Sequence, residues 1–98
     1  MNEITLDAAG WQSGDDVYSA FLHAVGAPSW HGRNLDALRD SIGAGQINVI
    51  EVPYRLVFRN YGAAGESARK MIDLFADVIR GLIAEGCPVE LQIVDGNR

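Results

Sequence analysis

The chain has 98 residues, enough for one domain with a modest hydrophobic core and too few for a separate catalytic module. Its 48% hydrophobic and 21% charged residues are typical of a globular domain rather than a disordered chain or a coiled coil. A net charge of −5 disfavours nucleic acid and anionic membranes as partners and favours a basic protein.

The sequence lacks the features of exported, membrane-inserted and metal-binding proteins. Cys87 is the single cysteine, so it forms neither an internal disulfide nor a cysteine metal cluster, and we interpret it as a small buried apolar residue. No apolar run approaches the roughly 18 residues of a membrane span. The start, MNEITLDAAG, does not resemble a signal peptide. We therefore expect a cytoplasmic protein with no metal and no cofactor.

The beginning of the chain predicts a strand and a helix. In EITLD, Ile4 and Leu6 alternate with polar residues, which is typical of a short strand. The segment SGDDVYSAFLHAVG predicts a helix of about three turns. Ser13 can cap the start of this helix, with Asp16 three residues later, and Gly26 can end it.

A second, shorter helix is predicted after Asn34, a suitable N-cap, and it ends at the glycines of GAG, residues 43–45. Its apolar side consists of Leu35, Leu38 and Ile42. Asp36 and Asp40 lie about 40° apart around the helix axis on the opposite side, so both carboxylates are expected to face water. A negative charge in the first turn suits Asp36. Asp40 has no such benefit, and Asp36 repels it.

The second half of the chain predicts two strands around a long helix. We interpret YRLVF as a buried strand, because Pro53 is tolerated at the beginning of a strand and not inside it. The role of residues 46–52 is left open. Residues 66–86 give the strongest helical pattern and end at Gly86. The apolar positions of this helix are Ala68, Met71, Ile72, Phe75, Val78, Ile79, Leu82 and Ile83. The closing segment PVELQIVD predicts a strand whose inward residues are Val89, Leu91 and Ile93.

The order of these elements predicts the fold class. Helices separate the predicted strands, which argues against hairpins and favours parallel pairing through right-handed crossovers. No internal repeat or low-complexity linker divides the chain. We therefore predict one α/β domain over residues 1–98, with a three-stranded parallel sheet flanked by helices.

The residues present give little support for catalysis. His31, in the loop WHG, could act as acid or base with Asp36 or Asp40. No nucleophile motif, phosphate-binding glycine loop or metal-ligand spacing accompanies it. His23 is expected at the edge of the first helix without a role. We therefore predict that the protein is not an enzyme, and an acid-base enzyme using His31 and Asp36 stays open as an alternative.

The loop before the second helix favours a protein interface. Trp30 and His31 lie in this loop with Gly32, so a large aromatic side chain is expected beside the two carboxylates. In one interpretation, Trp30 folds back on the core and the acidic face is merely solvated. In the other, an aromatic anchor and charge complementarity together form a binding surface.

The run SWHGRNLDALRDSI closely resembles the barstar family of ribonuclease inhibitors. In that family a loop of aromatics and a glycine precedes Asn-Leu-Asp-Ala-Leu, and a second Asp follows four residues after the first. The run AEGC, residues 84–87, followed by a strand, is similar to the end of the same family. The resemblance implies a three-stranded parallel sheet flanked by helices, in a barstar-like domain.

The resemblance also implies a function, which is inhibition of a basic secreted ribonuclease of the barnase type in a one-to-one complex that protects the producing cell. In that family the second helix and the loop before it enter the nuclease cleft. Carried over to this chain, Asp40 would take the place of a substrate phosphate, and Asp36 would flank it. The other partner-binding residues implied are Trp30, His31, Asn34, Gly43, Asp77 and Glu85.

Several positions depart from the family pattern. Arg33 replaces a residue that is commonly acidic, and Arg39 replaces a large apolar residue between the two aspartates. One acidic contact of the family falls on Gly81, and Asp77 could substitute for it one turn earlier. We interpret these departures as tuning to a different nuclease. The alternative function is a binding module for a basic protein that is not a nuclease.

Overall fold

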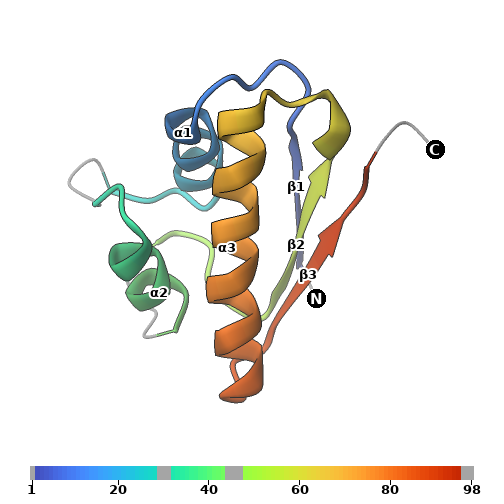
Figure 1. The fold of residues 1–98 in the computed structure, drawn as a ribbon. Helices are drawn as coiled ribbons and strands as arrows, with labels where there is room; N and C mark the ends of the chain where they lie inside the picture. The colour runs from blue at the N-terminus through green and yellow to red at the C-terminus, as the bar shows by residue number, and fades with distance from the viewer. Residues whose placement is uncertain (1, 29–31, 44–47, 96–98) are drawn as a thin grey trace.

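The computed structural model describes residues 2–28, 32–43 and 48–95. Its strands and helices follow one another as the sequence predicts, with one short 3₁₀ helix added after the second strand (Figure 1). The strands are β1 (Asn2–Asp7), β2 (Tyr54–Arg59) and β3 (Val89–Ile93). The helices are α1 (Gly14–Ala24), α2 (Leu35–Gly43), η1 (Tyr61–Ala63) and α3 (Glu66–Ala84).

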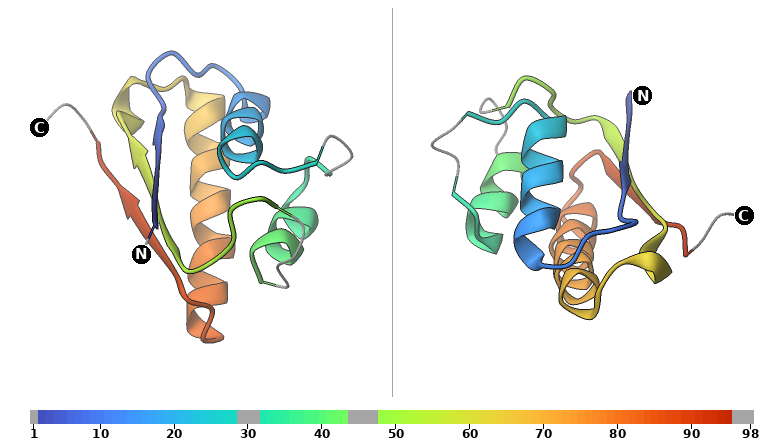
Figure 2. Two further views of the ribbon diagram at one scale, coloured as in Figure 1. Left: turned by 180° about the vertical axis from the view of Figure 1, so that it is seen from behind. Right: turned by 90° about the horizontal axis from the view of Figure 1, so that it is seen from above.

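The strands form the predicted parallel sheet, in the order β1-β2-β3. In the observed register, Leu56 of β2 lies between Ile4 of β1 and Leu91 of β3. The three α-helices lie on the same side of the sheet (Figures 1 and 2). Helix α2 is the outermost and packs chiefly against α3. Helix α2 therefore contacts the rest of the domain mainly through α3 and not through the sheet.

The core lies between the sheet and helices α1 and α3, and Phe75 of α3 is at its centre. The Phe75 ring packs edge-to-face against Tyr18 and Phe21 of α1 and against Phe58 of β2. The ring centroids are 4.9, 5.8 and 6.2 Å apart, respectively, within the range of favourable aromatic pairs. These contacts fix α3 between α1 and the sheet. They thereby fix the helix on which α2 rests.

Some residues predicted to face inward are more exposed than expected. Met71, Val78, Leu91 and Ile93 are only partly buried, and Ile83 and Cys87 also differ from the prediction. Ile83 is 41% exposed, because Leu82 takes the inward position in the last turn of α3 and the next residue points about 100° away from it. Cys87 is half-buried, since it lies in the loop before β3 rather than inside the core.

Of residues 46–52, whose role the sequence left open, 46 and 47 lie outside the described residues, and 48–52 form neither helix nor strand. The backbone of 48–52 follows the end of α1, where the Ile50 N–H donates to the Val25 carbonyl at 2.9 Å and the Val49 N–H to the Gly26 carbonyl at 3.4 Å. Gly26 has a φ of +68°, and a Cβ atom there would lie 2.7 Å from the Cβ atom of Val49. A single glycine therefore ends α1 and permits this close approach.

Candidate protein-binding surface

Helix α2 begins as its sequence predicts. The Asn34 side-chain Oδ1 accepts a hydrogen bond from the backbone N–H three residues later at 2.8 Å, which caps the helix. Leu38 and Ile42 are buried on its inner side. Ser41 is buried beside them and is hydrogen-bonded to the Asn48 side chain. The helix is therefore held at its start and along its inner face.

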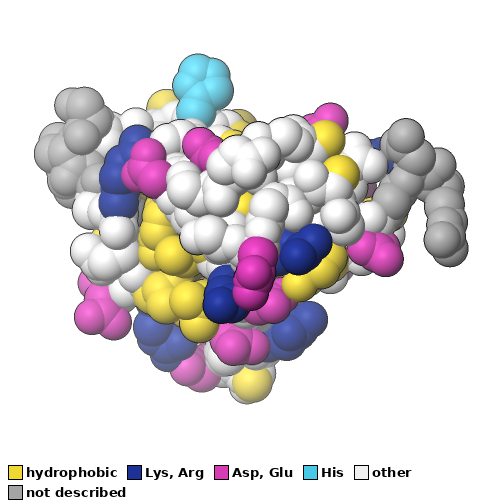
Figure 3. All heavy atoms as spheres, turned by 45° about the horizontal axis from the view of Figure 1, so that its top comes forward, with side chains coloured by type: hydrophobic (Ala, Val, Ile, Leu, Met, Phe, Trp, Pro, Cys, Tyr) yellow, Lys and Arg dark blue, Asp and Glu magenta, His cyan; other side chains and the backbone are white. Residues whose placement is uncertain are grey.

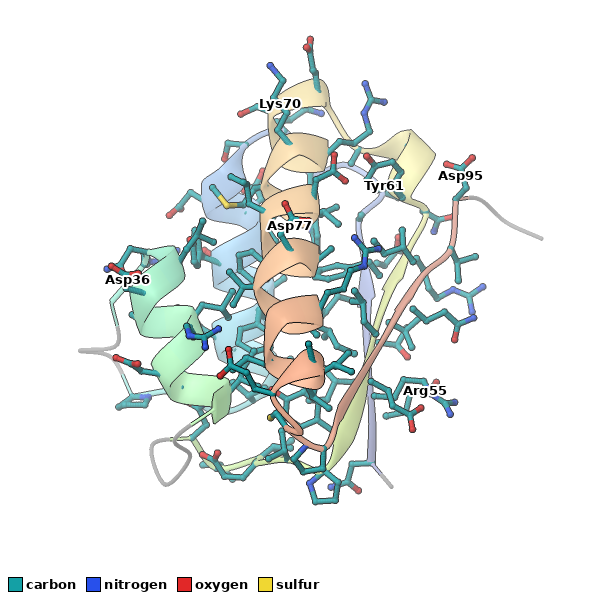
Figure 4. The ribbon with its side chains drawn as sticks, turned by 60° about the horizontal axis from the view of Figure 1, so that its bottom comes forward. Asp36, Arg55, Tyr61, Lys70, Asp77 and Asp95 are labelled. Atoms are coloured by element: carbon teal, nitrogen blue, oxygen red, sulfur yellow. The ribbon has the colours of Figure 1, made fainter. Side chains whose placement is uncertain are left out.

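The two aspartates of α2 are exposed, as predicted. Figure 4 shows Asp36 projecting from α2 away from the rest of the molecule. Within the described residues, neither Asp36 nor Asp40 forms an ion pair or a side-chain hydrogen bond. Their like charges repel at a cost of about 0.2 to 0.5 kcal/mol, which attraction between Asp40 and the neighbouring Arg39 offsets in part. The outer face of α2 therefore presents two exposed negative charges that have no ion-pair partner among the described residues.

Arg33, which precedes α2, is bound to α1. Its Nη1 atom lies 2.8 Å from Oδ1 of Asp15 and 3.0 Å from Oγ of Ser19. Asp15 thus neutralises the positive charge that the sequence places near the acidic face. The same contacts tie the start of α2 to α1.

Arg39 is bound to α3. Its guanidinium forms an ion pair with Glu85, the residue that follows the last turn of α3. The hydrogen bond and the charge of Glu85 raise the pKa of Arg39, and the charge of Asp40 adds to the effect. A Cβ atom at Gly81 would lie 3.7 Å from Nη1 of Arg39. The guanidinium therefore lies over α3 at a residue that has no side chain.

A groove of about 410 Å³ lies beside this ion pair. It lies between the end of α2 and the turn that joins α3 to β3, and both charged and apolar residues line it. The residues that line it are Arg39, Asp40, Gly43, Val52, Leu82, Glu85, Gly86, Cys87 and Pro88. The groove joins one exposed aspartate of α2 and the end of α3 into one surface.

Three of the predicted partner-binding residues meet at this groove, namely Asp40, Gly43 and Glu85. Gly43 is the last residue of α2, and a Cβ atom there would lie 3.0 Å from Cδ2 of Leu82, so α2 and α3 approach closely at this point. Asn34 lies at the other end of α2 and acts as its cap.

The remaining predicted contacts lie elsewhere. Asp77 is on α3, with its side chain 75% exposed and 3.9 Å from that of Arg80, and it does not line the groove (Figure 4). Trp30 and His31 lie outside the described residues, so the aromatic anchor beside the carboxylates stays a prediction.

Sequence reasoning missed the Arg39–Glu85 pair and the apolar wall of the groove. The two ion-pair partners are 46 residues apart in the chain, so no local spacing reveals them. One signal was present, because Arg39 and Gly81 both depart from the family pattern and the structure places them side by side.

Cys87, which lines the groove, has a thiol that is not activated. Burial raises the pKa of the Cys87 thiol, and the charge of Glu85 adds to this shift, so the reactive thiolate is disfavoured.

Across residues 2–28, 32–43 and 48–95, no three His, Cys, Asp or Glu side chains are grouped as a metal site would require. In the same ranges no helix combines the length and apolar character needed to cross a bilayer. On the face drawn in Figure 3, acidic and basic side chains adjoin one another.

Comparison with known proteins identifies the family of the chain. No curated protein matches the sequence. A family model described as barstar (barnase inhibitor) matches residues 1–94, nearly the whole chain. The match includes residues 29–42 and 84–87, the two runs that carry the sequence resemblance. The chain therefore belongs to the barstar family, which is described as a family of barnase inhibitors.

Proposed function

We propose that this protein is an immunity-type inhibitor of a basic ribonuclease of the barnase type and acts in the cytoplasm of the cell that makes the nuclease. The observation that carries the proposal is the charge arrangement of α2. Asp36 and Asp40 are exposed together, whereas Arg33 and Arg39 are engaged with other helices. Membership of the barstar family supports the class of partner.

The geometry of α2 suits insertion into a cationic cleft. A ribonuclease must hold the phosphates of RNA with basic side chains, and a carboxylate at the right place can substitute for a phosphate. Asp40 is proposed for that role, with Asp36 beside it. The helix is capped and tied by one ion pair to α1 and by another to α3, so it loses little conformational freedom on docking.

The proposal also accounts for the repulsion between Asp36 and Asp40 in the free protein, because cations of the partner would relieve it. The net charge of −5 would speed association with a basic nuclease, and salt would weaken this effect. Trp30 and His31 are proposed to add apolar contact area next to the carboxylates. The proposed peripheral contacts are Asn34, Gly43, Asp77 and Glu85.

The test is inhibition of barnase in an RNA-cleavage assay, since barnase is the nuclease that the family description names. Asp40→Asn should weaken inhibition by about 30-fold or more, the loss typical of an interface hot spot, and Asp36→Asn by less. Glu66→Gln is the matched control. It removes one negative charge at the other end of α3, where Glu66 lies 3.5 Å from Lys70, and it should leave inhibition unchanged.

Two results would count against this function. Full inhibition by both Asp36→Asn and Asp40→Asn would show that α2 is not the inhibitory surface. Isolation of the chain from its source cell with a basic protein that cleaves no RNA would favour the non-nuclease binding module instead.

A further inference from the structure

Arg39 is placed where it affects how the acidic surface meets a partner. It adjoins Asp40 in sequence and lines the groove. Its side chain is 42% exposed, and that of its ion-pair partner Glu85 is 59% exposed. A protein that covers α2 and the groove must therefore also cover this ion pair.

The ion pair changes the charge that the partner meets. Without Arg39, the surface would present the carboxylates of Glu85, Asp36 and Asp40. With Arg39 in place, Glu85 is neutralised and a guanidinium lies beside it. An Arg or Lys of the partner directed at Glu85 would meet another cation, which costs affinity when both are covered. An uncharged hydrogen-bond acceptor meets no such repulsion, since the guanidinium has five N–H donors to share.

The absence of a side chain at Gly81 permits this arrangement. A Cβ atom there would already be in van der Waals contact with Nη1 of Arg39, at 3.7 Å, so a longer side chain extended in that direction would compete with the guanidinium for space. Residues 81 and 85 lie one turn apart at the end of α3. The surface between them is thus covered by a residue of α2.

We infer that Arg39 is a specificity-determining residue. By holding Glu85 in an internal ion pair, it favours a nuclease that presents an uncharged hydrogen-bond acceptor at the groove and disfavours one that presents Arg or Lys there. The inference rests on the proposed inhibition of a ribonuclease and adds the chemistry of one contact to it.

The experiment uses barnase as the probe and measures its inhibition constant and association rate with wild type, Arg39→Gln and the double variant Arg39→Gln/Glu85→Gln. Arg39→Gln frees the Glu85 carboxylate. Affinity for this basic enzyme should therefore rise by about three- to tenfold, and the association rate should become more sensitive to salt. The second substitution should cancel both effects.

Arg55→Gln is the matched control. Arg55 lies 3.3 Å from Glu3 and 3.0 Å from Glu90, in neighbouring strands and on the far side of α3 from α2 (Figure 4). Its substitution makes the same change in net charge and also frees carboxylates, but at a distance from α2. Thermal unfolding of each variant separates a folding defect from a change in binding.

The outcomes distinguish the inference from the function on which it rests. A gain for Arg39→Gln that exceeds that for Arg55→Gln and disappears in the double variant supports the specificity role. If the wild type inhibits the enzyme and Arg39→Gln and Arg55→Gln change this inhibition equally, Arg39 does not determine specificity. The proposed function then still stands. Failure of the wild type and of every variant to inhibit barnase and other basic ribonucleases of its type overturns the proposed function and the inference with it.

Discussion

Replacing Asp40 by asparagine should make the free protein more stable, although Asp40 is the residue proposed to matter most for inhibition. Asp40 lies in the last turn of α2, which ends at Gly43, and the helix dipole disfavours a negative charge there. It also lies one turn after Asp36, which repels it. Asparagine has a similar shape and a similar helix propensity, so the substitution removes the charge and little else.

The expected gain in the free energy of unfolding is about 0.5 to 1 kcal/mol. A negative charge in the last turn of a helix costs roughly 0.3 to 1 kcal/mol, and the repulsion from Asp36 costs roughly 0.2 to 0.5 kcal/mol. Attraction to the adjacent Arg39 offsets part of this sum. For a chain of 98 residues, such a gain raises Tm by roughly 2 to 8 °C.

Urea unfolding at low ionic strength, followed by circular dichroism, measures this effect for wild type, Asp40→Asn and Asp36→Asn. Asp36 lies in the first turn, where the dipole favours its charge, so its substitution should leave stability unchanged or slightly lower. Salt should reduce the gain of Asp40→Asn, because it screens exposed charges. A loss of stability in Asp40→Asn would refute the reasoning, since the carboxylate would then contribute to the fold.

Two further predictions concern the framework that carries α2. Gly26→Ala should destabilise the protein by about 2 kcal/mol or more, because alanine is strained at a φ of +68° and its Cβ atom would lie 2.7 Å from that of Val49. Gly10→Ala, at a φ of +87° in open space, is the control in urea unfolding, and an equal loss there would show that the contact with Val49 is unimportant. The pKa of Asp16 is lowered because its carboxylate accepts hydrogen bonds from the backbone N–H groups of Gln12, at 2.7 Å, and Ser13, at 3.1 Å. This stabilisation is present above the unfolded pKa of about 4 and is lost as the pH falls through the lower folded pKa. The stability of Asp16→Asn, measured by urea unfolding between pH 2.5 and 7, should therefore depend less on pH below 4 than that of wild type, and identical profiles would contradict the argument.

The strands, the helices and the sheet could be predicted because their signals are local. Asn34 caps α2 with its own side chain. The helical spacing of apolar residues places Phe75 on the inner face of α3. Parallel pairing followed from the helices between the strands, since a hairpin cannot contain them.

The contacts that define the groove could not be predicted, because they join distant parts of the chain. Arg39 and Glu85 are 46 residues apart, and only the packing of α2 on α3 brings them together. The exposure of Ile83 has the same origin, since helical spacing assigns an apolar face but does not show where the neighbouring elements end.

The positions of the two arginines support the proposal that the acidic pair of α2 is a binding surface rather than a solvated helix face. Arg39 follows Asp36 by three residues, a spacing at which side chains of opposite charge can pair along a helix and gain roughly 0.2 to 0.5 kcal/mol. The structure instead joins Arg39 to Glu85, and Arg33 to Asp15. Both cations near the acidic face therefore brace α2 against its neighbours, and its two carboxylates have no ion-pair partner among the described residues. Either pairing of Arg39 would add a similar, small stabilisation to the fold. The observed pairing ties α2 to α3 and leaves the negative charge of Asp36 and Asp40 uncompensated, as binding to a basic partner requires.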